Sequence, residues 1–171
     1  MPLNPESLRI LPARETDVPV ILDFIRQLAE YEKLSDEVAA TEATLSETLF
    51  GERPYAEVLI AYWDDVPAGF ALFFHNYSTF LAKPGIYLED LFVNPGSRGL
   101  GIGKALLTRL AEVALERGCG RVEWAVLDWN EPSIEFYRRM GARAMDEWTT
   151  FRLTGEALAQ YGELPNEPAT H

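Results

Sequence analysis

The stretch Arg98-Gly99-Leu100-Gly101-Ile102-Gly103-Lys104 decides how the second half of this sequence folds. It follows a strand-like run that Asn94-Pro95-Gly96 breaks, and it opens an amphipathic segment, residues 101–117, with the apolar spacing of a helix. The first N–H groups of a helix lack partners within it, and the helix dipole favours negative charge there. Because glycines also let a bulky anion come close, the stretch predicts a pyrophosphate site, with Arg98 and Lys104 adding positive charge.

Two common nucleotide-binding motifs do not fit this loop. A P-loop needs Gly, four residues and then Gly-Lys-Ser/Thr, but Arg98 stands at the position of its first glycine and Ala105 replaces its hydroxyl residue. The dinucleotide motif Gly-x-Gly-x-x-Gly also fails, because counting from Gly99 puts Lys104 at the last position. The loop is therefore either a site for another pyrophosphate ligand or a purely structural helix entry.

Strand-like and helix-like segments alternate along the rest of the chain. We expect strands over residues 8–11, 55–63, 68–77, 86–93, 121–127 and 147–153, with a hairpin turn at 64–67. We expect further helices after a cap at Thr16, over residues 41–50, and from Asn130 to Gly141. This order predicts one mixed α+β domain over residues 1–171, with a flexible C-terminal tail from about residue 162.

The composition is that of a globular protein with a strong negative charge. The 171 residues include 27 acidic and 15 basic side chains, a net charge of −12, so nucleic acid and anionic membranes are poor partners. No apolar run approaches the roughly 20 residues that span a bilayer, and we expect a cytoplasmic protein. The acidic surface either attracts cations such as polyamines or only serves solubility.

Three further segments carry a resemblance to a known family. They are Tyr-Leu-Glu-Asp-Leu-Phe-Val at 87–93, Asn-Glu-Pro-Ser-Ile-Glu-Phe-Tyr at 130–137 and Leu-Ala-Glu-Tyr-Glu at 28–32. With the glycine loop, the sequence over about residues 8 to 155 resembles the GNAT acetyltransferase superfamily, and within it the spermidine/spermine (diamine) and thialysine acetyltransferase branch. The resemblance implies a central, twisted, mostly antiparallel sheet flanked by helices, and a homodimer.

The resemblance also implies acetyl-CoA as cosubstrate. In the family, the central strand pairs with the pantetheine arm, the glycine loop holds the pyrophosphate, and an Asn of the later motif contacts the cofactor. Carried over to this sequence, the cofactor-binding residues are Leu91, Phe92, Val93, Arg98, Gly99, Leu100, Gly101, Ile102, Gly103, Lys104, Asn130, Pro132, Ser133 and Tyr137.

Acetyl transfer from a thioester to an amine requires that the amine lose a proton and that the leaving thiolate gain one. The resemblance places the Tyr137 hydroxyl near the thiol, so we expect Tyr137 to be the general acid; by position alone it is a core aromatic residue. It places Glu89 at the substrate end, where the carboxylate binds or deprotonates the amine, either directly or through water. Tyr137 and Glu89 are the expected catalytic residues.

Three other residues are expected to bind substrate with Glu89. Asp90 follows Glu89 on a predicted strand, so the two side chains are expected on opposite faces, and Asp90 holds either a second cationic group or a structural partner. Tyr31 and Glu32 resemble residues that line the family's acceptor site. There Tyr31 offers a ring face for a cation and Glu32 meets a distal ammonium, unless both lie on an exposed helix end.

Two other chemistries have little support in the sequence. The single cysteine, Cys119, has no histidine close in sequence, although the fold can still bring His75 near it. Two histidines and one cysteine form no recognisable metal-ligand spacing, so we expect no metal. Direct attack of the amine on acetyl-CoA in a ternary complex is the simpler mechanism.

The leading hypothesis is an acetyl-CoA-dependent N-acetyltransferase whose acceptor is a primary amine of a small cationic molecule. A polyamine, another diamine and a thialysine-like amino acid all remain possible acceptors. Two alternatives stay open, namely acetylation of a protein N-terminus or lysine, and a non-catalytic CoA-binding sensor.

Overall fold

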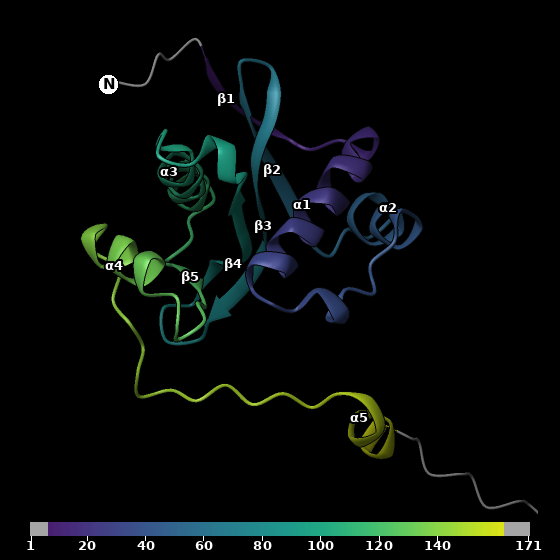
Figure 1. The fold of residues 1–171 in the computed structure, drawn as a ribbon. Coiled ribbons are helices and arrows are strands. Elements are labelled where there is room, and N and C mark those ends of the chain that lie inside the picture. Colours follow the sequence, from purple (N-terminus) through teal and green to yellow (C-terminus); the bar gives the residue numbers. More distant parts are fainter. Residues whose placement is uncertain (1–6, 163–171) are drawn as a thin grey trace, which may run out of the picture. The chain divides into compact units, whose positions relative to one another are not determined.

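The computed structural model describes residues 7–162, and the chain divides into two compact units, Met1–Leu127 and Asp128–His171 (Figure 1). The first unit is built on a five-stranded sheet in the order β1-β2-β3-β4-β5. Neighbouring strands are antiparallel except β4 and β5, which are parallel. The strands are β1 (Leu8–Pro12), β2 (Glu57–Trp63), β3 (Val66–Ser78), β4 (Lys83–Val93) and β5 (Val122–Trp124). This sheet and its helices confirm the predicted α+β class.

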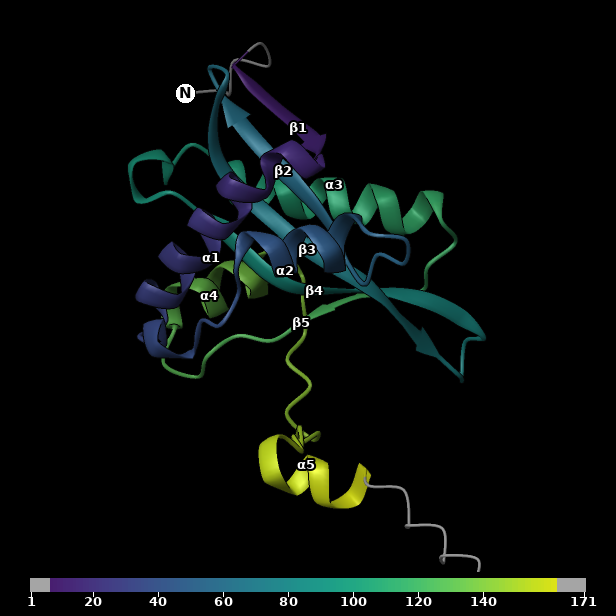
Figure 2. The same cartoon turned by 90° about the vertical axis from the view of Figure 1, so that its right-hand side faces the viewer.

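Helices cover both faces of the sheet (Figures 1 and 2). One face carries α1 (Val18–Tyr31) and α2 (Glu42–Phe50), and the other carries α3 (Ile102–Glu116). The short 3-10 helices are η1 (Glu15–Asp17), η2 (Ser35–Glu37) and η3 (Pro95–Ser97). The predicted helices over residues 41–50 and 101–117 are thus present within one residue of their expected ends.

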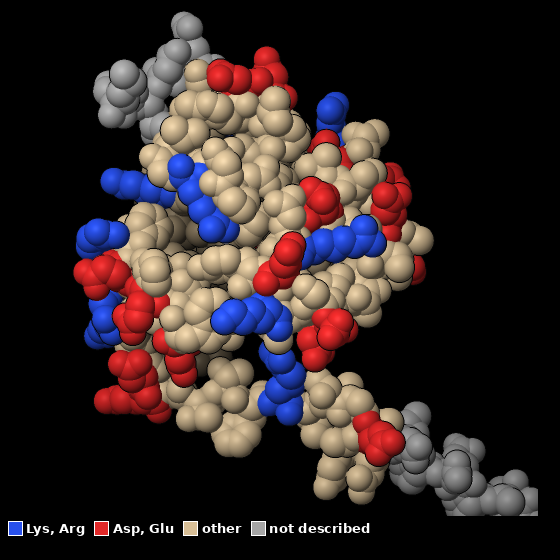
Figure 3. Space-filling view, in the orientation of Figure 1, with Lys and Arg blue, Asp and Glu red and all other residues tan. Residues whose placement is uncertain are grey.

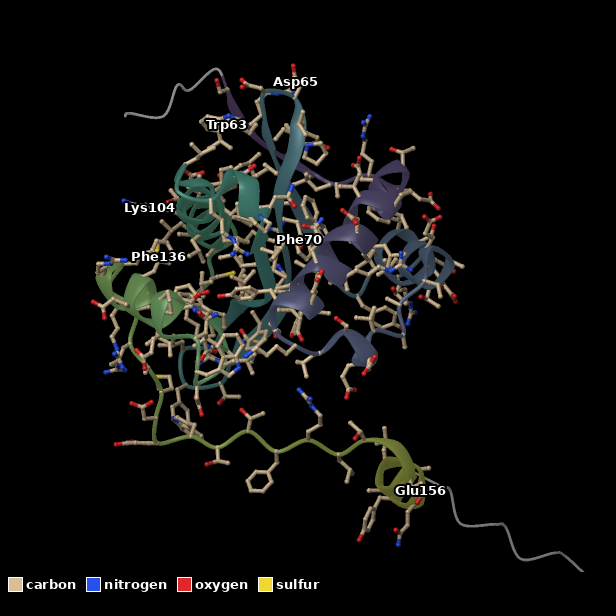
Figure 4. All side chains as sticks on the ribbon, in the orientation of Figure 1. Trp63, Asp65, Phe70, Lys104, Phe136 and Glu156 are labelled. Carbon is tan, nitrogen blue, oxygen red and sulfur yellow. The ribbon has the colours of Figure 1, made fainter. Side chains whose placement is uncertain are left out.

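Aromatic stacking fixes α1 against the sheet. The Phe24 ring lies parallel to the Phe70 ring with centroids 5.3 Å apart, and it meets Phe92 edge-on at 6.4 Å. All three side chains are buried, and Figure 4 labels Phe70 between α1 and the sheet. Such pairs add about 0.5–1.5 kcal/mol each to the burial of their area. This packing holds the middle of α1 against β3 and the end of β4.

The starts of the first two helices differ from each other. Thr41 caps α2, where its hydroxyl accepts from the Thr44 N–H at 3.2 Å and its own N–H donates to Thr44 Oγ1 at 3.0 Å. The predicted cap at Thr16 is wrong, because Thr16 lies within η1 and α1 follows directly. Pro19 in the first turn of α1 has the fixed φ of a helix and no N–H to satisfy, so this start needs no side-chain cap.

The β2–β3 hairpin has a shorter turn than the predicted one at 64–67. Asp64 and Asp65 have φ of 48° and 66°, the left-handed region that a two-residue hairpin turn requires, and Val66 already belongs to β3. Figure 4 shows Asp65 at the tip of this hairpin, where its carboxylate pairs with Arg9.

The second unit contains α4 (Glu131–Arg139) and α5 (Gly155–Gly162). The predicted strand over residues 147–153 is wrong, and this segment has no regular structure. Its alternating pattern is real, but an extended segment is stable as a strand only when another strand pairs with it. Trp148 and Phe151 are exposed there by 76% and 92%. The flexible tail expected from about residue 162 lies almost wholly outside the described residues.

Candidate active site

A bulge in β4 determines where the substrate-side carboxylates lie. Leu72 of β3 pairs with Asp90 and Phe73 pairs with Leu88, so Glu89 is an extra residue between them. Paired residues share a face of the sheet. Leu88 therefore lies on the α3 face with Phe73, whereas Asp90 lies on the α1 face with Leu72. The expected strict alternation of Glu89 and Asp90 does not hold, because the bulge interrupts it at Glu89.

Beyond the bulge, β4 parts from β5. The parallel pairing joins Ile86 to Val122 and ends with Leu88 and Trp124. β5 is therefore shorter than the strand predicted over residues 121–127, and among the described residues no strand pairs with this edge of β4 after Leu88. An edge strand presents backbone donors and acceptors to a ligand that can use them. Leu91, Phe92 and Val93, predicted to bind the pantetheine arm, lie in this segment.

Glu89 comes close enough to Asp90 and Glu32 at the bulge to affect the protonation of both. Burial, then the charge of Glu89 and then that of Glu32 together raise the pKa of Asp90 to about 6. Burial and then the charge of Glu89 also raise the pKa of Glu32. Every resolved influence on these two groups opposes their negative charge. A bound cation would relieve this repulsion and lower both pKa values.

The end of α1 completes this cluster of carboxylates. Tyr31 is the last residue of α1, and Glu32 is its C-terminal cap. The structure thus brings Tyr31, Glu32, Glu89 and Asp90 together in the first unit, and their role in binding substrate stays a prediction. It also adds a residue that the sequence did not indicate, because burial and then the charge of Glu89 raise the pKa of Tyr87.

Acidic side chains are not confined to this cluster. Figure 3 shows them at several separate places on one face of the molecule, with basic side chains among them. The overall charge of −12 is therefore in large part a property of the general surface. The net charge alone therefore does not identify a cation site.

The glycine loop has the backbone form of an anion site. Gly99 and Gly101 have φ of 82° and 80°, a region that other residues rarely adopt. Gly101 precedes α3 and supplies no side-chain cap, so the first N–H groups of this 15-residue helix are left for a ligand. A Cβ at Gly99 would meet nothing within 4 Å, which makes the loop approachable from that side. These features fit the pyrophosphate of acetyl-CoA.

Arg98 and Lys104 flank this loop in different ways. Lys104 is an exposed residue of the first turn of α3, and Figure 4 shows its side chain projecting from the helix. The Arg98 guanidinium lies over the Tyr31 ring, 4.9 Å from its centroid, and 5.6 Å from the centroid of Phe92. Its Nε donates to the Val93 carbonyl oxygen at 3.2 Å. Arg98 therefore contacts the substrate-side helix as well as the loop.

The remaining predicted site residues belong to the second unit and lie together on α4. Asn130 is the N-terminal cap, where its side-chain oxygen accepts from the Ser133 N–H at 3.4 Å. Pro132 lies in the first turn. The ring of Tyr137 meets that of Phe136, labelled in Figure 4, at 5.7 Å between centroids. The local structure thus explains Asn130 and Pro132 as helix-start residues, and their contacts with the cofactor stay a prediction.

Cys119 and His75 do come close, with Sγ 3.9 Å from Nδ1. However, His75 Nδ1 lies 3.0 Å from the Gly85 carbonyl oxygen, which can only accept, and Arg117 donates to Nε2 at 2.9 Å. These contacts assign the proton of a neutral ring to Nδ1. The nitrogen beside the thiol is therefore already protonated, which argues against His75 as the base for an acetyl-cysteine route.

The Arg117 side of this network was not evident from the sequence. Arg117 is held by Glu57 through two hydrogen bonds of 2.7 and 2.8 Å, which join the end of α3 to β2. The two residues are 60 positions apart. No local sequence pattern predicts an ion pair between residues so far apart.

Residues 7–162 show neither a metal-binding cluster nor a membrane-spanning helix. No group of three or more His, Cys, Asp or Glu side chains there is arranged to hold a metal ion. No helix in this part of the chain has the length and apolar character needed to cross a membrane.

Comparisons with known proteins agree with this geometry. The model of the Acetyltransferase (GNAT) family matches residues 23–142. A thialysine N-epsilon-acetyltransferase of Sus scrofa is 42% identical over 165 residues, which cover 90% of this chain and 96% of that protein. An L-ornithine N5-acetyltransferase of Arabidopsis thaliana is 38% identical over 201 aligned positions, covering 91% of this chain and 88% of that protein.

A solved structure shares the same fold. An integron cassette protein from the mobile metagenome of V. cholerae superimposes with a TM-score of 0.78 at 27% identity, over 92% of this chain and 99% of that one. The family match and both sequence relatives extend across the boundary between the two units at residue 127.

Proposed function

Since the chain belongs to the GNAT acetyltransferase family and is an acyltransferase, we propose that it transfers an acetyl group from acetyl-CoA to a primary amine of a small cationic substrate. The observation that carries this proposal is the cluster of Glu32, Glu89 and Asp90 at the bulge of β4. The repulsion among them, together with the burial of Glu32 and Asp90, favours a ligand that brings positive charge.

The acceptor we propose carries a second positive charge in addition to the amine that reacts. One carboxylate is needed near the reacting amine. The other two would suit the second positive charge of a polyamine, another diamine or a thialysine-like amino acid. The names of the relatives, which act on thialysine and L-ornithine, support this class. In this proposal Glu89 serves the reacting amine, and Glu32 and Asp90 hold the distal cation beside Tyr31.

Acetyl-CoA, when bound, supplies the acetyl group as a thioester. We propose that the uncapped N–H groups at the start of α3 bind its pyrophosphate, assisted by Arg98 and Lys104. The free edge of β4 at Leu91–Val93 binds the pantetheine arm through backbone hydrogen bonds. The family model spans both units, which supports one acetyltransferase domain, and the family resemblance assigns Asn130, Pro132 and Ser133 to cofactor binding.

Two proton transfers are assigned to protein groups in this mechanism. The Glu89 carboxylate takes a proton from the substrate ammonium, directly or through water, so that the nitrogen lone pair is free to attack. The Tyr137 Oη donates its proton to the leaving sulfur. No metal is assigned, and the neutral tautomer of His75 leaves direct attack simpler than an acetyl-cysteine route.

We also propose a cytoplasmic homodimer that does not act on nucleic acid or membranes. The net charge of −12 supports the second part. The exposed apolar side chains of residues 147–153, Trp148 and Phe151 among them, support association with a second copy. Light scattering of the purified protein tests the dimer, because a monomer at micromolar concentration would contradict it.

A panel of acceptors tests the proposed reaction. The purified protein is incubated with acetyl-CoA and spermidine, spermine, putrescine, thialysine, L-ornithine or lysine, and thiol release and product mass are followed. We expect acetylation of at least one of these amines. Acetyl-CoA binding without acetylation of any of them would contradict the proposal and favour a protein acceptor or a non-catalytic sensor.

A further inference from the structure

Arg98 occupies a position between the two halves of the proposed site. Its guanidinium lies 4.9 Å from the centroid of the Tyr31 ring, within the range of a cation–π contact, and also faces Phe92 at 5.6 Å. Its Nε donates to the Val93 carbonyl oxygen at 3.2 Å, so the side chain is anchored on β4. Yet Arg98 is the first residue of the glycine loop that leads into α3.

The ring that Arg98 covers lies next to the carboxylate cluster in the chain. Tyr31 ends α1 directly before Glu32, and Glu32 shares its electrostatic environment with Glu89 and Asp90. An ammonium group drawn to these carboxylates would meet Tyr31 as the adjacent aromatic surface. Two cations cannot share one ring face without repelling each other.

An anion in the glycine loop offers Arg98 a stronger partner. A guanidinium binds phosphate through charge-assisted, often bidentate, hydrogen bonds, which exceed a cation–π contact at an exposed ring. Tyr31 is 38% exposed, so its contact with Arg98 belongs to the weaker class. Arg98 is itself exposed and precedes Gly99, whose φ of 82° turns the chain at this point.

We propose that Arg98 is a positioning residue that covers Tyr31 until a pyrophosphate in the glycine loop draws it away. Release of the ring then opens the acceptor side to the substrate ammonium, so the two ligands bind with positive coupling. This inference rests on the proposed function for the identity of the acceptor. The movement of Arg98 itself depends only on an anion in the loop.

Amine binding measured without chemistry tests the coupling. Titration calorimetry with spermidine is run on the protein alone and on the protein saturated with CoA, which carries no acetyl group. We expect CoA to strengthen spermidine binding by roughly fivefold or more. In Arg98→Gln, spermidine binding to the protein alone is expected to be as tight as to the CoA-loaded wild type, with little further gain from CoA.

Arg9→Gln is the matched control, because Arg9 also lies over a tyrosine ring, that of Tyr62, at 5.9 Å. It should keep the coupling of the wild type. Tyr31→Leu should weaken spermidine binding both with and without CoA. The proposal is overturned if Arg98→Gln weakens CoA binding but leaves spermidine binding to the protein alone unchanged.

A second measurement does not depend on the acceptor. The Arg98 guanidinium carbon lies 4.9 Å from the centroid of the Tyr31 ring, so the NMR signals of the guanidinium group should carry a ring-current shift that Tyr31→Leu removes. We expect CoA to remove this shift in the wild type. If CoA binds and the shift persists, the proposal fails whatever the acceptor is. If the shift disappears but no amine is bound or acetylated, the proposed acceptor class is at fault instead.

Discussion

The two ends of the proposed active site are built in different ways. The anion end, residues 98–104, is one continuous loop that uses backbone N–H groups and two glycines with positive φ. The cation end gathers Glu32 from the end of α1 and the pair Glu89 and Asp90 from a bulge in β4. At the anion end, a ligand would accept hydrogen bonds from backbone N–H groups that have no partner within the helix, so its site destabilises the fold little. The cation end holds like charges together, so a cationic ligand stabilises it.

The largest effect is expected from removing the base at the cation end. Glu89→Gln should lower turnover by about 10²–10⁴-fold, the usual contribution of a general base, while acetyl-CoA affinity stays unchanged because the glycine loop is intact. Steady-state kinetics and calorimetry with CoA check the two parts. Glu112→Gln, on the exposed side of α3, is the control. An equal loss of CoA affinity in Glu89→Gln would remove the distinction between the two ends.

Asp90→Asn should stabilise the fold at neutral pH. A carboxyl whose pKa is raised from 3.8 to about 6 on folding favours the folded state most below pH 3.8, and this stability is lost as the pH rises through 6. At 1.36 kcal/mol per unit, the loss is up to about 3 kcal/mol. Denaturant unfolding at pH 4 and pH 7.5 should show this decline in the wild type and a smaller one in Asp90→Asn.

Asp64→Asn is the control for this stability effect, because Asn also tolerates the left-handed φ of 48° in the β2–β3 turn. The same Asp90→Asn protein should bind spermidine more weakly at pH 7.5. The prediction fails if Asp90→Asn is less stable than the wild type at pH 7.5 and its stability still declines with pH as in the wild type. That result would show that a partner in the fold stabilises the Asp90 carboxylate.

The anion end should respond to backbone conformation. Gly101→Ala places a Cβ at φ of 80°, which costs about 1–2 kcal/mol, and should weaken acetyl-CoA binding by roughly tenfold. Gly96→Ala, in the η3 turn just before the loop, is the control, because its Cβ would meet nothing within 4 Å and its φ is not in the left-handed region. Similar CoA affinities for the two variants would mean that the loop conformation does not hold the pyrophosphate.

The smallest effect is expected from a single charge at the anion end. Lys104 is exposed on the first turn of α3, and an exposed ion pair contributes about 0.2–1 kcal/mol. Lys104→Gln should therefore raise the dissociation constant for CoA only about twofold to fivefold, and less at high salt. Calorimetry at two salt concentrations checks this. A loss as large as that of Gly101→Ala would show that charge, rather than backbone geometry, dominates.

The same contrast explains how much the sequence could predict. The glycine loop and α3 were predictable, because Gly99, Gly101 and the apolar spacing that follows lie within one stretch. The bulge at Glu89 was not, because it arises from the register between β3 and β4 rather than from any local pattern. The predicted opposition of Glu89 and Asp90 assumed a regular strand and missed this register.

Other errors have the same origin in long-range pairing. The strand predicted over residues 121–127 is reduced to Val122–Trp124, where it pairs with β4, and the segment 147–153 has the pattern of a strand but no regular structure. The contact of Arg98 with Tyr31 joins positions 67 apart and has no sequence signature. Most helices and strands were predicted from their local pattern, whereas the register, the bulge and the extent of the last strands depend on partner strands and were not.

Discrimination between a diamine and a monoamine of equal length tests the central claim most directly. Putrescine and n-butylamine are compared as acceptors with saturating acetyl-CoA, by kcat/KM for thiol release. Because Glu32 and Asp90 are proposed to hold a distal cation, we expect putrescine to be preferred by at least about tenfold, with the preference largely lost in Asp90→Asn. Equal kcat/KM values for the two amines in the wild type would contradict the proposed role of the carboxylate cluster.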